Sequence, residues 1–174
     1  MGQHRELCLL LVGKNIFVND LYDEEDVGCQ KLMKNLCEQR CWKQKKAALI
    51  GEVPIGAVVV HDNEIIGRGH NLREHSQLAV DHAEMMAIEE ANQVLNSWRL
   101  VDCTLYVTLE PCIMCSGGIV NSRLKRVVFG ARDPKAGAVS TLYRLLNDQR
   151  LNHQVEVTEG VLAADASQQL KAFF

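Results

Sequence analysis

The sequence predicts an α/β fold, a three-layer α/β/α sandwich built on a five-stranded mixed sheet. Segments with the composition of strands alternate with segments of helical periodicity, which is typical of layered α/β folds. The first two strand segments follow one another across a short turn, so the sheet is expected to begin with a hairpin. The chain has 174 residues, of which 47% are hydrophobic and 24% charged. That is enough apolar material for one core and too little length for two comfortable domains.

The first predicted helix is followed by the hairpin. Leu32–Ile50 is rich in Lys, Gln, Ala and Leu, which favour helix, and Gly51 is expected to end this helix. Pro54–Val60 is a nearly continuous run of β-branched and small apolar residues, and Glu64–Gly69 is predicted to be the second strand. Residues 61–63, His-Asp-Asn, supply the turn between the two strands.

Two further helices are predicted to begin at residues of chemical interest. Asp81 is expected to N-cap a helix that runs to about Leu95, which places His82 in the first turn. After the strand Thr104–Leu109, Pro111 is expected to begin the next helix, where its missing N–H costs least. The remaining elements are predicted to be two strands and a closing helix: Arg126–Gly130, Val155–Glu159 and Ala163–Phe174.

The charge distribution and the number of cysteines indicate which partners and which cellular compartment to expect. The net charge is −3, yet residues 121–150 carry seven Lys and Arg against two Asp and Glu. This local excess either faces a phosphate backbone or forms a solvated surface. Seven cysteines are an odd number, which is typical of a reducing compartment and predicts a cytoplasmic protein. No apolar run approaches the roughly 20 residues needed to span a bilayer, so no membrane association is expected.

His82, Cys112 and Cys115 are residue types that together suit Zn²⁺. One imidazole and two thiolates leave a fourth tetrahedral position for water, as a catalytic zinc requires. Glu84 is placed to move protons between that water and a substrate. The pattern predicts one Zn²⁺ per chain and hydrolysis at an electrophilic carbon. It also matches the H-x-E…P-C-x-x-C signature of zinc nucleobase deaminases.

Two other interpretations of the cysteine pair stay open. A Cys-x-x-Cys pair also occurs in redox centres, but a redox role leaves His82 and Glu84 unexplained. A structural zinc needs a fourth protein ligand, for which Cys103 is the nearest candidate, although it precedes a predicted strand.

Four segments carry a resemblance to a known family: Glu52–Ala57, His82–Met85, Thr108–Cys115 and Arg126–Asp133. On these segments the chain from about residue 32 to residue 174 resembles the bacterial tRNA-specific adenosine deaminases, which have the cytidine deaminase-like fold. The first three segments are shared with guanine and cytosine deaminases. The fourth, together with Leu151–His153 and the terminal Ala172–Phe174, points to the tRNA enzymes.

The resemblance implies a reaction and a set of site residues. The reaction is the hydrolysis of adenosine to inosine at the wobble position of a tRNA anticodon loop. The implied metal ligands are His82, Cys112 and Cys115, the implied catalytic residue is Glu84, and the implied substrate-binding residues are Asn71, Ala57, Glu110 through its carbonyl, and Asp133. For Asn71 a plain turn residue stays an alternative, as does a turn or cap acid for Asp133.

The substrate is expected to be a single-stranded or loop base, because a stacked base cannot reach the metal-activated water. A tRNA anticodon stem-loop satisfies this, and the basic stretch 121–150 would then contact phosphates. The resemblance also implies a homodimer in which each site is completed near the neighbouring subunit. A deaminase of a free base such as guanine or cytosine would share the whole metal site. The non-enzyme alternative is a zinc-stabilised RNA-binding module, which has no use for Glu84.

The chain is predicted to consist of an N-terminal extension and one catalytic domain. Residues 1–32 form an extension of unknown role, because they lie outside the resemblance and offer no ligand, base or basic patch. Residues 33–174 form the zinc-dependent deaminase domain.

Overall fold

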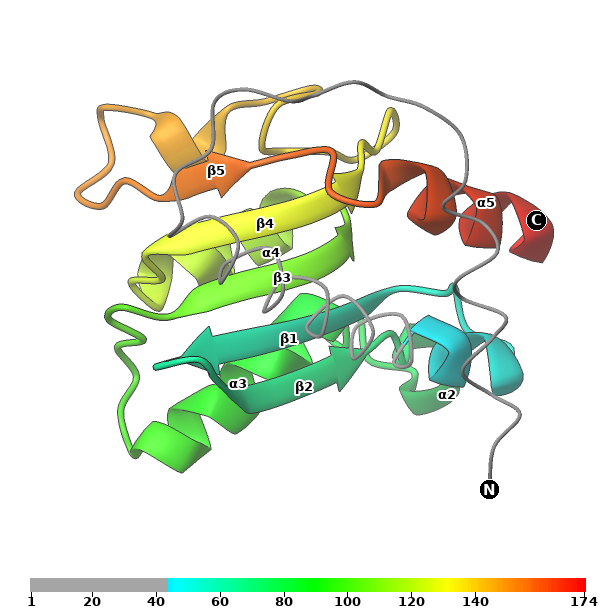
Figure 1. Cartoon of the computed structure of the whole chain (residues 1–174), viewed down its shortest axis with the longest axis horizontal. Coiled ribbons are helices and arrows are strands. Elements are labelled where there is room, and N and C mark those ends of the chain that lie inside the picture. Colours follow the sequence, from blue (N-terminus) through cyan, green and yellow to red (C-terminus); the bar gives the residue numbers. More distant parts are fainter. Residues whose placement is uncertain (1–43) are drawn as a thin grey trace, which may run out of the picture.

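The computed structural model describes residues 44–174 and shows a five-stranded sheet with helices packed on it (Figure 1). The strand order is β2-β1-β3-β4-β5. The strands are β1 (Gly56–His61), β2 (Glu64–His70), β3 (Thr104–Leu109), β4 (Arg126–Ala131) and β5 (Glu156–Thr158). β1 is antiparallel to β2 and β3, whereas β3, β4 and β5 run parallel. The predicted mixed sheet is confirmed.

The hairpin between β1 and β2 closes through a two-residue turn. Asp62 and Asn63 both have positive φ, 47° and 64°. Asp and Asn tolerate this left-handed conformation better than other residues with a side chain, which suits them to a tight hairpin turn. His61, expected in the turn, instead ends β1 and pairs with Glu64.

The described helices are α2 (Arg73–Ser76), α3 (Ala83–Leu95), α4 (Ile113–Asn121) and α5 (Ala163–Phe173), with a short 3-10 turn at Leu145–Asn147. Residues 44–49 are also helical, and the chain turns at Gly51 with φ 77°. The remainder of the predicted Leu32–Ile50 helix lies outside the described residues. The sequence did not predict α2, which is a single polar turn without apolar periodicity. Within residues 44–174 no helix is both long and apolar enough to cross a bilayer.

Helices lie on both faces of the sheet, which gives the three layers. The face packed against α3 and α4 contributes alternate strand residues to the main core, among them Ala57, Val59, Leu105, Val107, Val127 and Phe129. The intervening residues Val58, Val60, Tyr106 and Val128 gather on the opposite face. There α5 approaches β4 closely, since a Cβ at Gly130 would lie 3.3 Å from the Ala166 side chain.

Close backbone contact fixes α3 on β2. A Cβ added to Gly67 or Gly69 would collide with a backbone carbonyl of α3, that of Ala87 or Ala83 respectively. The missing side chains therefore let the helix lie directly on the strand. This contact sets the position of the N-terminus of α3, where two of the candidate site residues lie.

Candidate active site

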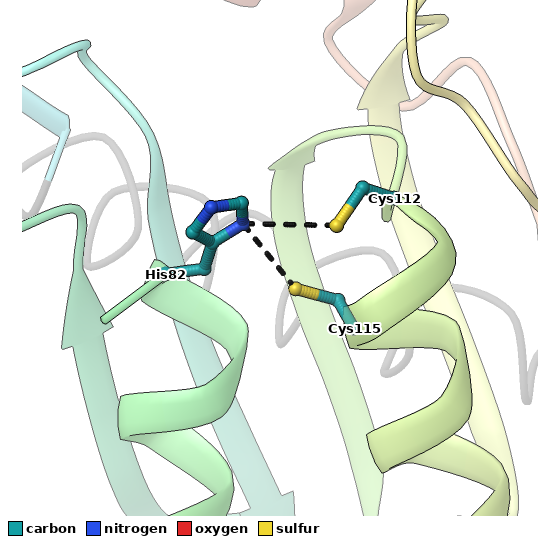
Figure 2. A group of neighbouring side chains, drawn as sticks. All are labelled: His82, Cys112 and Cys115. Carbon is teal, nitrogen blue, oxygen red and sulfur yellow. Dashed lines mark hydrogen bonds between the residues drawn. The ribbon is translucent and has the colours of Figure 1, made fainter. Parts of the chain in front are cut away.

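The N-termini of α3 and α4 bring His82, Cys112 and Cys115 together (Figure 2). His82 Nδ1 lies 3.7 Å from Cys112 Sγ and 3.6 Å from Cys115 Sγ. The three donor atoms all lie within 4.8 Å of one another. Among residues 44–174 this is the group of His, Cys, Asp and Glu side chains that could hold a metal ion. Residues thirty positions apart in the sequence thus share one point in space.

His82 and Cys112 are the N-cap residues of their helices, not residues of the first turn. Both have extended backbone, with φ −81° and ψ 152° at His82 and φ −76° and ψ 178° at Cys112. Neither side chain caps its helix. The expected N-cap at Asp81 and the expected helix start at Pro111 are therefore wrong. An N-cap side chain ordinarily bonds to the helix backbone, but these two side chains face each other instead.

The donor set fits a borderline-soft divalent cation. An imidazole nitrogen and two sulfurs are the ligands that such ions prefer. Hydrogen bonds from Cys115 and His82 lower the pKa of Cys112 to about 4, although burial opposes this. Donation to Cys112, together with burial, raises the pKa of Cys115.

Cys103, the candidate for a fourth ligand, does not join this group. Its side chain is fully buried just before β3, and its Sγ lies 3.5 Å from the carbonyl oxygen of Val101. Burial raises the pKa of Cys103 to about 11, which disfavours the thiolate that a metal would need. Three protein ligands among the described residues leave a tetrahedral ion one position for another ligand.

Glu84 lies in the first turn of α3, beside His82, Cys112 and Cys115. Its side chain is 4% exposed. Burial raises its pKa to about 7, against the opposing influence of its own backbone hydrogen bond and of His82. A carboxyl group with a pKa near neutrality can both take up and release a proton under physiological conditions.

Asn71 and Ala57 lie in different surroundings. Asn71 follows β2, is 4% exposed, and donates from Nδ2 to Glu52 Oε2 at 2.9 Å. The next residue, Leu72, donates its N–H to the carbonyl of Asp81 at 3.0 Å, which ties this segment to the start of α3. Ala57 is fully buried in the main core and presents no surface. Sequence reasoning assigned no role to Glu52, although it lies in a segment that carried the resemblance.

The Glu110 side chain organises the loop that follows β4. Its carboxylate accepts hydrogen bonds from the backbone N–H groups of Asp133, Val139, Ser140 and Thr141, at 2.8 to 3.1 Å, and from the Thr141 hydroxyl. Burial raises the pKa of Glu110, but these hydrogen bonds outweigh burial and hold the pKa below its usual value. The loop also lies against Cys112, because the backbones of Gly137 and Cys112 form an antiparallel β-bridge. The sequence interpretation considered only the carbonyl of Glu110 and missed this role of its side chain.

Asp133 takes part in the turn at the start of this loop. Its Oδ1 accepts hydrogen bonds from the backbone N–H groups of Lys135 at 2.8 Å and Ala136 at 3.2 Å. These contacts correspond to the alternative interpretation, in which Asp133 is a turn acid.

The basic stretch 121–150 is partly neutralised. Ion pairs join Lys125 to Asp102, Arg132 to Glu159 and Arg150 to Asp148, at 3.3, 2.5 and 2.6 Å. Within the described part of the chain, Lys135 and Arg144 have no ion pair and are exposed. These two cations remain available for a polyanion.

Comparison with known proteins identifies the family. The family model of MafB19-like deaminases matches residues 31–174. The tRNA-specific adenosine deaminases of Streptococcus pyogenes serotype M1 and Bacillus subtilis (strain 168) are 54% and 57% identical over 130 residues. These alignments cover 75% of this chain and 76% and 81% of the two relatives.

Two solved structures of deaminases are similar to this chain. One structure comes from studies of A-to-I editing by tRNA:A34 deaminases at the wobble position of transfer RNA. It matches with a TM-score of 0.75 and 34% identity, over 78% of this chain and 99% of that one. A guanine deaminase from Bacillus subtilis matches with a TM-score of 0.54 and 36% identity, over 57% of this chain and 64% of that one. By identity and coverage, the chain belongs to the family of tRNA-specific adenosine deaminases.

Proposed function

We propose that the protein converts adenosine to inosine at the wobble position of a tRNA anticodon loop, with Zn²⁺ held by His82, Cys112 and Cys115. Its family makes it a hydrolytic enzyme that deaminates adenosine in tRNA. One observation carries the proposal: an imidazole and two sulfurs within 4.8 Å of one another beside a buried carboxyl group. A redox role or a plain RNA-binding role would not need that carboxyl group.

The three side chains supply nitrogen and sulfur ligands that suit Zn²⁺ and leave one coordination position open. Zn²⁺ in such a site acts as a Lewis acid and makes water a nucleophile near neutral pH. The helix N-termini that carry the ligands add a favourable electrostatic field for thiolates and for negative charge that develops on the substrate.

Glu84 carries the protons of the reaction. It takes a proton from the attacking water and delivers it to a ring nitrogen of adenine. It then takes the remaining proton of that water from the new hydroxyl group on the attacked carbon and passes it to the departing amino group, so that adenosine and water give inosine and ammonia. Its burial beside Cys115 and a pKa near neutrality suit a group that must both accept and donate.

The substrate-binding assignments extend outward from the metal site. Asn71 contacts the flipped nucleoside, and the loop after β4, with Asp133, meets the neighbouring RNA. The unpaired Lys135 and Arg144 support phosphate contacts. An anticodon loop offers an adenosine that is extruded at low cost. A tRNA substrate also supports a cytoplasmic location.

A homodimer is part of the proposal. Val80 and Ile113 are 55% and 54% exposed. Val80 lies two residues before His82, and Ile113 directly follows Cys112. Exposed apolar side chains next to metal ligands are well suited to cover by a second subunit.

The test is to incubate the zinc-loaded protein with a tRNA that carries adenosine at the wobble position, then to sequence the RNA for inosine. We expect inosine at that position alone. Glu84→Gln should keep the metal and lose roughly 10²- to 10⁴-fold in rate. Glu156→Gln, at an exposed position on β5, is the matched control and should behave as the wild type. Ammonia release from free guanine or cytosine without inosine in tRNA would contradict the proposal.

A further inference from the structure

Glu52 is a buried carboxylate to which the reaction described above assigns no role. Its side chain is 1% exposed. Glutamate is rarely buried without partners, because its desolvation is costly unless hydrogen bonds replace the lost water. Within residues 44–174 Glu52 takes part in no ion pair. Its burial therefore depends on hydrogen bonds.

Both oxygens of Glu52 bind one short segment, residues 71–76. Oε2 accepts from Asn71 Nδ2 at 2.9 Å, and Oε1 accepts from the backbone N–H of His75 at 2.6 Å. On the same side, the N–H of Asn71 donates to the carbonyl of Ile55 at 3.1 Å. Glu52 thus anchors the segment that leads from β2 to the metal site.

The contact between Glu52 and Asn71 also fixes which end of the Asn71 amide faces which way. Asparagine can turn over and exchange its NH₂ and carbonyl groups, and only its hydrogen bonds decide between the two orientations. A carboxylate that accepts hydrogen bonds selects the nitrogen end. Within residues 44–174 the Asn71 side chain makes no other hydrogen bond, so one amide N–H and Oδ1 remain for another partner.

We propose that Glu52 is a positioning residue that orients the side-chain amide of Asn71 toward the nucleoside. This rests on the proposed function, in which Asn71 contacts the substrate. A fixed amide presents its donor and acceptor in set directions. The Asn71 side chain therefore has little rotational freedom left to lose when the nucleoside binds. Glu52 therefore acts through Asn71, not through contact with the substrate.

The first variant is Glu52→Gln, in which an NH₂ group replaces one of the two acceptor oxygens, so the hydrogen bond with Asn71 is either lost or remade with the Asn71 amide flipped. We expect full zinc content and a kcat on an anticodon stem-loop lower by roughly 10- to 100-fold. KM should change little, because phosphate contacts supply most of the affinity for RNA. Glu90→Gln is the matched control: Glu90 Oε2 accepts the N–H of Arg68 at 2.7 Å, away from the metal ligands. Wild-type kcat in Glu52→Gln would overturn the proposal.

A double variant separates positioning from stability. In Glu52→Gln/Asn71→Asp the new amide donates to the new carboxylate, and its carbonyl accepts from His75. Both hydrogen bonds are remade with donor and acceptor exchanged at position 71. We expect the melting temperature to return toward the wild-type value while kcat stays low. If kcat recovers together with stability, Glu52 has a purely structural role and the proposal is overturned. This test holds even if Glu52→Gln alone fails to fold.

One further readout does not depend on activity. The side-chain amide of Asn71 should give a resolved, slowly exchanging ¹H–¹⁵N signal in the wild-type protein, and this signal should broaden or shift in Glu52→Gln. If the wild type makes no inosine, the proposed function fails, yet this signal still tests the orientation of Asn71. An unchanged signal in Glu52→Gln would refute the orienting role itself.

Discussion

Two buried carboxyl groups close to the proposed metal ligands, those of Glu84 and Glu110, have different surroundings. Burial dominates at Glu84 and raises its pKa to about 7. At Glu110 hydrogen bonds outweigh burial and lower the pKa. Glu84 is therefore suited to proton transfer, whereas Glu110 stays charged and serves as an acceptor for the loop after β4. The number of donors that each carboxyl group meets decides its role.

The lowered pKa of Glu110 predicts a pH-dependent contribution to stability. Because its folded pKa lies below its unfolded value, the contribution is present above about pH 4.3 and is lost as the pH falls through the folded pKa. Glu110→Gln should therefore be less stable than the wild type at pH 7, by at least about 1–3 kcal/mol. The difference should shrink as the pH falls below about 4.

Urea denaturation of both proteins after metal removal measures this difference without interference from metal release in acid. Glu156→Gln, exposed on β5, should show no such trend. A difference between Glu110→Gln and wild type that stays constant with pH would mean that the charge of Glu110 does not hold the loop.

At the scale of elements, α3 and α4 each begin at a proposed metal ligand, His82 and Cys112. The carbonyls of His82 and Cys112 accept the first helical hydrogen bonds, from Met86 at 3.1 Å and Ser116 at 2.8 Å. The backbone therefore treats both residues as ordinary N-caps, while both side chains turn toward the metal site. Neither helix therefore gains the stability that a capping side chain would add.

The contact between α3 and β2 predicts that Gly69→Ala disturbs the site. The added Cβ would collide with the carbonyl oxygen of Ala83 and lie 2.8 Å from the backbone nitrogen of Ala87. The helix must shift, which costs on the order of 1–3 kcal/mol. Zinc affinity should fall as well, since His82 moves with α3. Thermal melts and competition with a chromophoric chelator measure the two effects.

Gly117→Ala on α4 is the matched control, because nothing lies within 4 Å of the added Cβ. This variant should be neutral or more stable, by up to about 1 kcal/mol, since alanine favours helix over glycine. Equal zinc affinity in Gly69→Ala and Gly117→Ala would show that α3 is not held in place by this strand.

Periodicity and composition were sufficient to predict most elements but not the helix starts. The bounds of β3 were predicted as observed, because its β-branched run ends at Glu110 and Pro111. The start of α3 was misplaced because cap preferences assume that the side chain bonds to its own helix. The start of α4 was misplaced because the preference of proline for the first helical position does not reveal that Cys112 has extended backbone. The acceptor roles of Glu52 and Glu110 could not be predicted, since their donors lie about 20 to 30 residues further along the chain.

At the scale of the whole molecule, the candidate site gathers at one end of the central strands. β3 leads through Glu110 into α4, and β4 leads into the loop that Glu110 holds. β2 leads through Asn71 toward α3. In sheets with parallel strands, ligand sites form beyond the carboxyl ends of those strands, because loops from neighbouring strands meet there. The N-terminal extension contributes none of the residues assigned to the site.

That arrangement predicts that residues 1–32 are dispensable. A chain that begins at Met33 keeps every assigned site residue and nearly all of the family match, which starts at residue 31. We expect inosine formation close to that of the full chain and a melting temperature lower by no more than about 4 °C, or about 1 kcal/mol for a chain of this size.

A chain that begins at Gln44 tests the boundary, because it also loses matched residues and most of the predicted first helix. It should melt well below the Met33 chain. Ala47, at the end of that helix, is fully buried, and in the Gln44 chain only the last residues of the helix would remain to hold it in place. If the Met33 chain melts as low as the Gln44 chain, residues 1–32 belong to the folded domain and the boundary at residue 33 is wrong.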